Sequence, residues 1–86
     1  MKLNEAVTSA KDQLHSILNL EIANVIAVSK IDDGWNVKID LIERRAIPDT
    51  MDIMGTYEVI LDDIGSIIKY ERKNQHKRMD LEETVE

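Results

Sequence analysis

The chain has 86 residues, with 11 Lys and Arg against 17 Asp and Glu, a formal charge of −6 and no cysteine. This length allows one domain, because a chain of this size buries only about 64% of its unfolded surface. The negative charge disfavours binding to nucleic acid or to anionic lipid. The lack of cysteine excludes disulfides, thiolate metal sites and a cysteine nucleophile. No apolar run is long enough to span a bilayer, so we expect a soluble, cytoplasmic protein.

The first predicted element is a helix that begins near Leu3. Apolar residues recur every three or four positions from Leu3 to Leu18, which is the spacing of one helical face. We expect Asn4 to cap the start of this helix and Asn19 to end it.

Beyond Leu20 the apolar period changes to two, which predicts paired strands at residues 23–31 and 35–44. The turn between them is Asp32-Asp33-Gly34, interpreted as a three-residue loop with Gly34 in the left-handed region. This loop length sets Ile31 opposite Trp35 and Val25 opposite Leu41. Those side chains would all share the face of the sheet that the helix covers.

The same pattern recurs after a connecting segment, with strands at 55–61 and 66–72 around a turn at 62–65. A four-residue loop would pair Val59 with Ile68 and Glu58 with Lys69. The connecting segment contains Ile47-Pro48-Asp49-Thr50. Because Pro48 restricts Ile47 and can open a short turn of helix, we expect this connection to be structurally fixed.

These elements predict an α+β fold, in which an N-terminal helix packs on a four-stranded antiparallel sheet made of two hairpins. Residues 1–72 are expected to form the single domain, and residues 73–86 a charged C-terminal tail. The sheet face turned away from the helix is expected to carry Ile26, Val28, Ile42, Ile60 and Ile67. A solvated face rarely holds so many aliphatic side chains, so it is the main predicted interaction surface. Alternatively, the tail covers this face through Met79, Leu81 and Val85.

The sequence shows no catalytic or metal-binding constellation. His15 and His76 are its only histidines, and neither has a second ligand at metal-binding spacing. The aspartate pairs of the two turns lack the alternating oxygen ligands of a calcium loop, so turn formation explains them. No serine lies in a nucleophile elbow, and the glycines are too scattered to hold phosphate. We therefore expect no enzymatic activity, no cofactor and no metal.

Two short basic runs, Arg44-Arg45 and residues 72–78, leave nucleic-acid binding or a regulatory role as the alternative function. The same residues would also serve as edge charges that discourage strand pairing. Trp35 is expected in the core, and its position beside a turn also makes it a candidate interface anchor.

An ordered set of residues, spread over a little more than half of the chain from about Asp33 to Arg78, carries a family resemblance. The set is Gly34-Trp35, Ile47-Pro48-Asp49-Thr50, Asp52, Tyr57-Glu58-Val59, Leu61-Asp62, Gly65, Tyr70 and Arg72. In this order and spacing it resembles the gas vesicle protein O family, the accessory proteins of gas vesicle synthesis. Two positions depart from the family pattern: Ala46 stands where a basic residue is expected, and Gln75-His76 where an Arg-Tyr pair is usual.

The resemblance implies a cytoplasmic, non-enzymatic factor that assists assembly of the gas-filled protein shell. Its implied partners are other gas vesicle proteins. The aliphatic sheet face adds a homodimer as a further expectation, while the hydropathy excludes a membrane and the negative charge disfavours nucleic acid. Ile47 and Pro48 then join Trp35 and the aliphatic face as predicted partner-binding residues.

Overall fold

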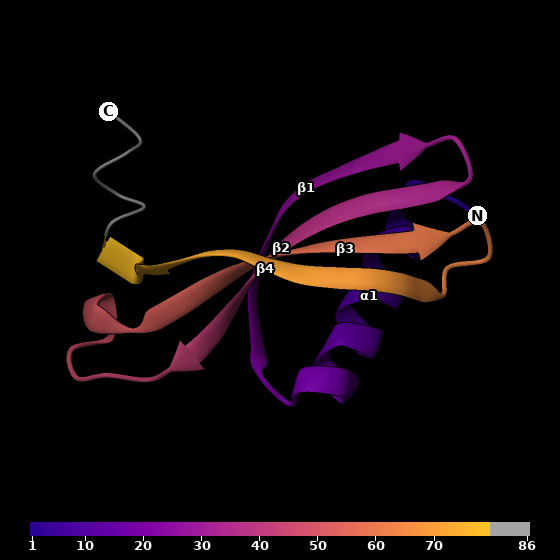
Figure 1. The fold of residues 1–86 in the computed structure, drawn as a ribbon. Coiled ribbons are helices and arrows are strands. Elements are labelled where there is room, and N and C mark those ends of the chain that lie inside the picture. The colour runs from indigo at the N-terminus through magenta and orange to yellow at the C-terminus, as the bar shows by residue number, and fades with distance from the viewer. Residues whose placement is uncertain (80–86) are drawn as a thin grey trace.

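The structure is a computed structural model, and it describes residues 1–79. Its elements are helix α1 (Leu3–Leu18), strands β1 (Glu21–Ile31) and β2 (Gly34–Arg44), the short 3-10 helix η1 (Asp49–Met51), and strands β3 (Ile53–Asp62) and β4 (Ile67–Lys77). The strands form one antiparallel sheet in the order β1-β2-β3-β4. Helix α1 packs on one face of this sheet against β1, β2 and β3 (Figure 1). The predicted α+β fold is confirmed.

The two ends of α1 are formed differently. At the start, the Glu5 carboxylate accepts a hydrogen bond from the backbone N–H of Lys2, at 2.7 Å. Asn4 lies inside the first turn and makes no cap, so that prediction is wrong. Asn19 follows the last turn in the left-handed conformation, with φ 57°, and its N–H donates to the His15 carbonyl. The predicted end of the helix is therefore confirmed.

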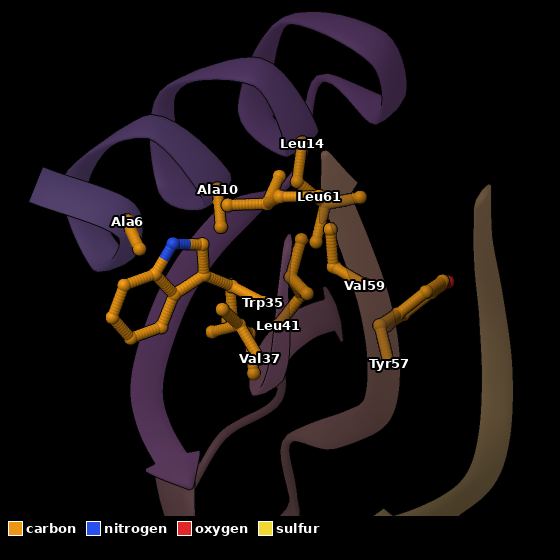
Figure 2. Packing of buried hydrophobic residues seen from close by; sticks show 10 residues of the cluster. Ala6, Ala10, Leu14, Trp35, Val37, Leu41, Tyr57, Val59 and Leu61 are labelled. Atoms are coloured by element: carbon orange, nitrogen blue, oxygen red, sulfur yellow. The ribbon is translucent and has the colours of Figure 1, made fainter. Parts of the chain in front are cut away.

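The core lies between α1 and the strands beneath it. Ala6, Ala10 and Leu14 recur every four residues and have no exposed surface. They cover buried side chains of β2 and β3, namely Trp35, Val37, Ile39, Leu41, Tyr57, Val59 and Leu61 (Figure 2). Because the alanines are small, the helix lies close to the sheet, and the Trp35 indole fits beneath them. Trp35 is only 6% exposed, which confirms its place in the core.

The first hairpin has a shorter turn than predicted. Only Asp32 and Asp33 lie in it, so Ile31 pairs with Gly34 and Lys30 pairs with Trp35. Gly34 is the first residue of β2, and it does not adopt a positive φ. The predicted pairing of Ile31 with Trp35, and the register that followed from it, are therefore wrong.

Two ladder irregularities in β1 change which of its side chains face the helix. They fall between Ile22 and Asn24 and between Val25 and Ala27. As a result Ile22, Val25 and Val28 all pack against the core. The predicted place of Val28 on the opposite face is wrong, because an inserted residue reverses the alternation of side chains along the strand.

The pairing of β3 with β4 in the second hairpin also differs from the predicted register. Val59 pairs with Tyr70, not with Ile68 as predicted. Ile68 falls at an irregularity in the ladder and is 66% exposed. Ile67 pairs with Leu61 and packs against the core, so its predicted place on the opposite face is also wrong.

The sheet face opposite α1, here called the outer face, is less aliphatic than predicted. Ile42 pairs with Met54 there, and both are buried, with 6% and 0% of their surface exposed. Ile60 is half-buried on the same face. Ile42 is consequently unavailable to a partner while the chain is folded.

Strand β4 continues to Lys77, so the predicted domain boundary at residue 72 falls within a strand. Residues 74–77 pair with β3. Leu81 and Val85, through which the tail was expected to cover the outer face, lie outside the described residues. Across residues 1–79, no helix combines the length and the hydropathy that crossing a membrane requires.

Candidate protein-interaction loop

Residues 45–52 connect β2 to β3 at the end of the sheet opposite the two hairpin turns (Figure 1). Ile47 is fully exposed, at 101%, and Pro48 beside it is exposed as well. The peptide bond between them is cis. Helix η1 follows directly, as the position of Pro48 predicts. Ile47 and Pro48 therefore form an exposed apolar projection, here called the Ile47–Pro48 tip.

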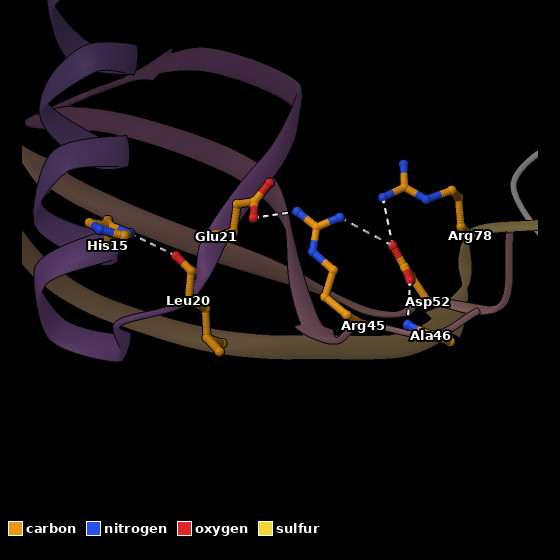
Figure 3. Close-up of polar contacts among 7 residues, drawn as sticks. All are labelled: His15, Leu20, Glu21, Arg45, Ala46, Asp52 and Arg78. Carbon is orange, nitrogen blue, oxygen red and sulfur yellow. Dashed lines mark hydrogen bonds and ion pairs between the residues drawn. The ribbon is translucent and has the colours of Figure 1, made fainter. Parts of the chain in front are cut away.

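Asp52 holds this loop from beneath. Its carboxylate has no exposed surface, and Oδ1 accepts a hydrogen bond from the Ala46 N–H at 2.7 Å. Oδ2 lies 3.0 Å from the Arg78 guanidinium and 3.8 Å from that of Arg45 (Figure 3). The Arg78 backbone N–H also donates to the Asp52 carbonyl, at 3.0 Å. A buried carboxylate is tolerated only with such partners, so the contacts fix the loop and the end of β4 together.

The two arginines connect the loop to both edges of the sheet. Arg45 forms a hydrogen-bonded ion pair with Glu21 at the start of β1. The Arg78 Nε–H donates to the Asp49 carbonyl in η1, at 3.2 Å. The tip is thus supported by contacts from β1 on one side and from the end of β4 on the other.

These contacts lower the pKa of Asp52 below its ordinary value. The hydrogen bond from the Ala46 N–H is the largest cause, burial acts in the opposite direction, and Arg78 and Arg45 add to the lowering. Asp52 is therefore a carboxylate throughout the neutral range.

Acidification is expected to weaken this end of the fold. A group whose pKa is lower in the folded than in the unfolded chain contributes stability above its unfolded pKa, and this is lost as the pH falls through the folded value. Since aspartate ordinarily titrates at 3.8, the free energy of unfolding should fall progressively below about pH 4. Urea titrations at a series of pH values would measure this. The Asp52→Asn variant should lose less stability over that range, and a parallel decline of both proteins would contradict the assignment.

A second polar network lies beside the loop, around Glu43. Its carboxylate accepts hydrogen bonds from the Tyr57 hydroxyl at 2.6 Å, from Arg72 at 2.9 Å and from Gln75 at 2.8 Å. Burial raises the pKa of Glu43, but these donors together outweigh it and leave the pKa below its ordinary value. Burial and the bond to Glu43 raise the pKa of Tyr57 to about 12. Neither group is therefore poised to transfer a proton near neutral pH.

A shallow depression of about 320 Å³ adjoins this network and opens to solvent. It is lined by Glu43, Arg44, Ile53 and Gln75. Glu43 and Arg44 precede the loop in the sequence and Ile53 follows it, so the depression lies at the base of the loop.

The basic runs are largely paired with carboxylates in the folded chain. Arg72 contacts Glu43 at 2.9 Å, and Lys73 lies 3.5 Å from Glu58 and 2.8 Å from Glu71. Glu58 and Glu71 face each other across β3 and β4, where Lys69 was expected opposite Glu58. A surface that binds a phosphate backbone needs positive charge that is not already neutralised. The pairing therefore weakens the case for nucleic-acid binding.

A second buried carboxylate, that of Asp40, has no signal in the sequence that predicts its burial. Thr56 donates a hydrogen bond to its Oδ1 at 2.6 Å, while Oδ2 lies 3.7 Å from Nε2 of His76. That separation is too long for a hydrogen bond. His76, expected at the surface of a tail, lies in β4 with its side chain 15% exposed. Within residues 1–79, no three His, Cys, Asp or Glu side chains are arranged to hold a metal ion.

The predicted partner-binding residues do not come together on one surface. Trp35 and Ile42 are buried, and Val28 and Ile67 pack against the core and are partly buried. Ile26 on β1, Ile60 on the outer face and the Ile47–Pro48 tip remain accessible in three separate places.

Comparison with known proteins identifies the family. The model of the family described as gas vesicle synthesis protein GvpO matches residues 1–82. The chain belongs to this family. It is 35% identical over 83 residues to gas vesicle protein O1 of Halobacterium salinarum and 37% identical over 84 residues to gas vesicle protein O of Haloferax mediterranei. A gas vesicle protein O from a Streptomyces species is 32% identical over 66 residues.

The matches cover 96%, 96% and 77% of this chain, but 70%, 60% and 52% of those three relatives. The chain thus spans between about half and 70% of the length of these curated relatives. No solved structure matches it. The family predicted from the ordered motif is confirmed.

Most motif residues of this GvpO-family chain have an internal role. Asp52 holds the loop, Tyr57 and Arg72 bind Glu43, and Gly65 adopts a positive φ of 94° in the turn before β4. Ile47 belongs to the same motif, yet its side chain is fully exposed. Packing among residues 1–79 therefore does not account for an isoleucine at that position.

Proposed function

We propose that this chain is a non-enzymatic accessory factor of gas vesicle assembly that binds other gas vesicle proteins through the Ile47–Pro48 tip. It would act in the cytoplasm, in association with gas vesicles. Family membership supports the role in gas vesicle formation. The observation that carries the proposed contact is a fully exposed isoleucine on a loop held by the buried Asp52.

A preformed loop suits recognition, because the entropy of ordering it is lost during folding and not during binding. Burying an isoleucine side chain contributes about 1.5–3 kcal/mol. The depression lined by Glu43, Arg44 and Ile53 lies at the base of the same loop and supplies polar groups on the side of the molecule that carries the exposed apolar tip. An apolar centre with a polar surround is the usual arrangement of a protein interface.

The protonation states of Glu43 and Tyr57 support a non-enzymatic role. The pKa of Glu43 is lowered and that of Tyr57 is raised to about 12, so both keep one protonation state across the neutral range. The alternative function, binding of nucleic acid, would have to use basic side chains that already contact carboxylates.

The Ile47→Ser variant tests the tip. Because Ile47 is fully exposed, we expect its free energy of unfolding to change by no more than about 0.5 kcal/mol. Affinity for the captured gas vesicle proteins should fall roughly 10- to 100-fold, because the variant loses the free energy of burying one isoleucine side chain in the interface. The measurement is a pull-down of tagged chain from gas-vesicle-forming cells, followed by titration of the captured protein.

Ile64→Ser is the matched control, since Ile64 is 76% exposed in the turn between β3 and β4, at the other end of the sheet. It should leave capture unchanged. If Ile47→Ser captures the same proteins with the same affinity, the tip is not the contact. Recovery of nucleic acid in place of gas vesicle proteins would favour the alternative function.

A further inference from the structure

The arginine side chains of this chain gather around the loop at residues 45–52. The sequence has four of them: Arg44, Arg45, Arg72 and Arg78. Arg44 ends β2, Arg45 begins the loop, and Arg78 directly follows β4. The Arg72 guanidinium reaches the same region, because it contacts Glu43 at the base of the loop, at 2.9 Å. The surface beside the Ile47–Pro48 tip is therefore rich in arginine, although the net charge of the chain is −6.

Among residues 1–79, Arg44 is the arginine whose charge is not used within the fold. Arg45, Arg72 and Arg78 each contact a carboxylate of this chain. Arg44 is exposed, and within the same described residues it has neither a hydrogen bond nor an ion pair. A guanidinium carries five N–H donors, so those of Arg44 are available to another molecule.

The position of Arg44 is set by the strand that carries it. Its backbone pairs with Ile53 on β3, directly after the ladder irregularity that follows Ile42. It lines the depression at the base of the loop, together with Glu43, Ile53 and Gln75. The Glu43 carboxylate in this depression already accepts hydrogen bonds from three other side chains. Arg44 therefore supplies the depression with a positive charge that the fold does not neutralise.

Arg44 and the tip lie within reach of a single partner. Ile47 follows Arg44 by three residues, so their Cα atoms are at most about 11 Å apart. A specific interface has about 20 residues or more on each side, so a protein that buries Ile47 also meets Arg44.

We propose, building on the proposed function, that the gas vesicle protein bound at the Ile47–Pro48 tip presents an aspartate or glutamate side chain to Arg44. A carboxylate matches a guanidinium in charge and in shape, since its two oxygens accept two parallel N–H groups. Nucleic acid is a poorer match, because a phosphate backbone requires several cations that are not already neutralised. Complementary charge beside an apolar contact fixes the orientation of the partner on the tip.

Neutralising Arg44 tests this pairing. The probe is the protein captured by the tagged wild-type chain, identified, purified and titrated with each variant. Arg44→Gln should weaken binding about tenfold at low salt, and its affinity should depend less on salt than that of the wild-type chain. Arg44→Lys should bind with intermediate affinity, because it keeps the charge but loses the parallel N–H groups. Lys69→Gln is the matched control: it removes the same charge from an exposed position on β4 and should bind like the wild-type chain.

The carboxylates of the captured protein are then neutralised one at a time. One of these changes should weaken binding to the wild-type chain and leave binding to Arg44→Gln unchanged, because the two groups act on each other. If no carboxylate behaves in this way, or if Lys69→Gln weakens binding as much as Arg44→Gln, the pairing is overturned. Binding of DNA or RNA that Arg44→Gln abolishes would assign Arg44 to phosphate and overturn it as well.

Ile47→Ser distinguishes the failure of this inference from the failure of the proposed function. If Ile47→Ser weakens binding and Arg44→Gln binds like the wild-type chain, the tip is the contact but Arg44 meets no carboxylate. If Ile47→Ser binds like the wild-type chain, the tip is not the contact, whatever the effect of Arg44→Gln. Both side chains are exposed, and unchanged thermal midpoints would show that both variants fold.

Discussion

The Gly34→Ala variant is expected to lose about 3 kcal/mol or more of its free energy of unfolding, although the change adds one methyl group. A Cβ atom at Gly34 would lie 1.8 Å from the Leu61 backbone oxygen and 3.0 Å from the Cα of Asp62. These are backbone atoms of β3, which pairs with β2 at this point, so no side-chain rotation relieves the overlap. The two central strands would have to separate. Denaturant titration followed by the fluorescence of Trp35, the one tryptophan of the chain, measures the loss.

Gly55→Ala is the comparison for this prediction. A Cβ at Gly55 would meet the Glu43 carboxylate at 2.5 Å and the Tyr57 ring at 2.9 Å, both of which are side chains that can move. Its loss should be smaller than that of Gly34→Ala. An equal or larger loss would mean that β2 and β3 can separate easily, contrary to their close approach in the structure.

The Asp52→Ala variant is expected to abolish gas vesicle formation in complemented cells. It removes the acceptor for the Ala46 N–H and leaves Arg78, whose side chain is 32% exposed, without its carboxylate partner. The loop would then be attached to the end of β4 only through its backbone carbonyls at Asp49 and Asp52, and we expect the proposed binding shape of the tip to be lost. Vesicle yield and amide exchange at Ala46 are the two measurements.

Asp52→Asn separates the two roles of this carboxylate. It keeps an oxygen that can accept the Ala46 hydrogen bond, but it removes the charge that pairs with Arg78 and Arg45. Exchange at Ala46 should therefore be faster than in the wild-type chain and slower than in Asp52→Ala. Protection of the Ala46 amide and normal vesicle yield in Asp52→Ala would show that the loop keeps its shape without this anchor.

The helix and the four strands could be predicted from the sequence, because the apolar spacing that identifies each of them depends only on residues within that element. Apolar residues recur every three or four positions from Leu3 to Leu18, which fits only a helix. Pro48 restricts the backbone around it and so indicates where η1 begins. The ordered motif predicted the family because its residues keep their spacing along the chain. These features need no knowledge of what lies across the sheet.

The faces of the edge strands could not be predicted in the same way. Val25 and Val28 both face α1 only because β1 gains a residue between them relative to β2. An irregularity of this kind is decided by packing against the neighbouring strand, and simple alternation of side chains does not reveal it. For the same reason Val28 and Ile67 were placed on the wrong face. The burial of Asp40 could not be predicted either, since the sequence does not distinguish a buried aspartate in a strand from a solvent-exposed one.

The sharing of Asp52 by Arg45 and Arg78 has a consequence for how this end of the sheet opens. Each edge strand is bonded on one side only, so the start of β1 and the end of β4 would ordinarily fray separately. Arg45 reaches Glu21 on β1, and Arg78 directly follows β4, while both contact one carboxylate. The two strand ends, which are not neighbours in the sheet, are thus coupled into one cooperative unit. Their amides should exchange with a common opening free energy, and the Ile47–Pro48 tip keeps its shape until that unit opens as a whole.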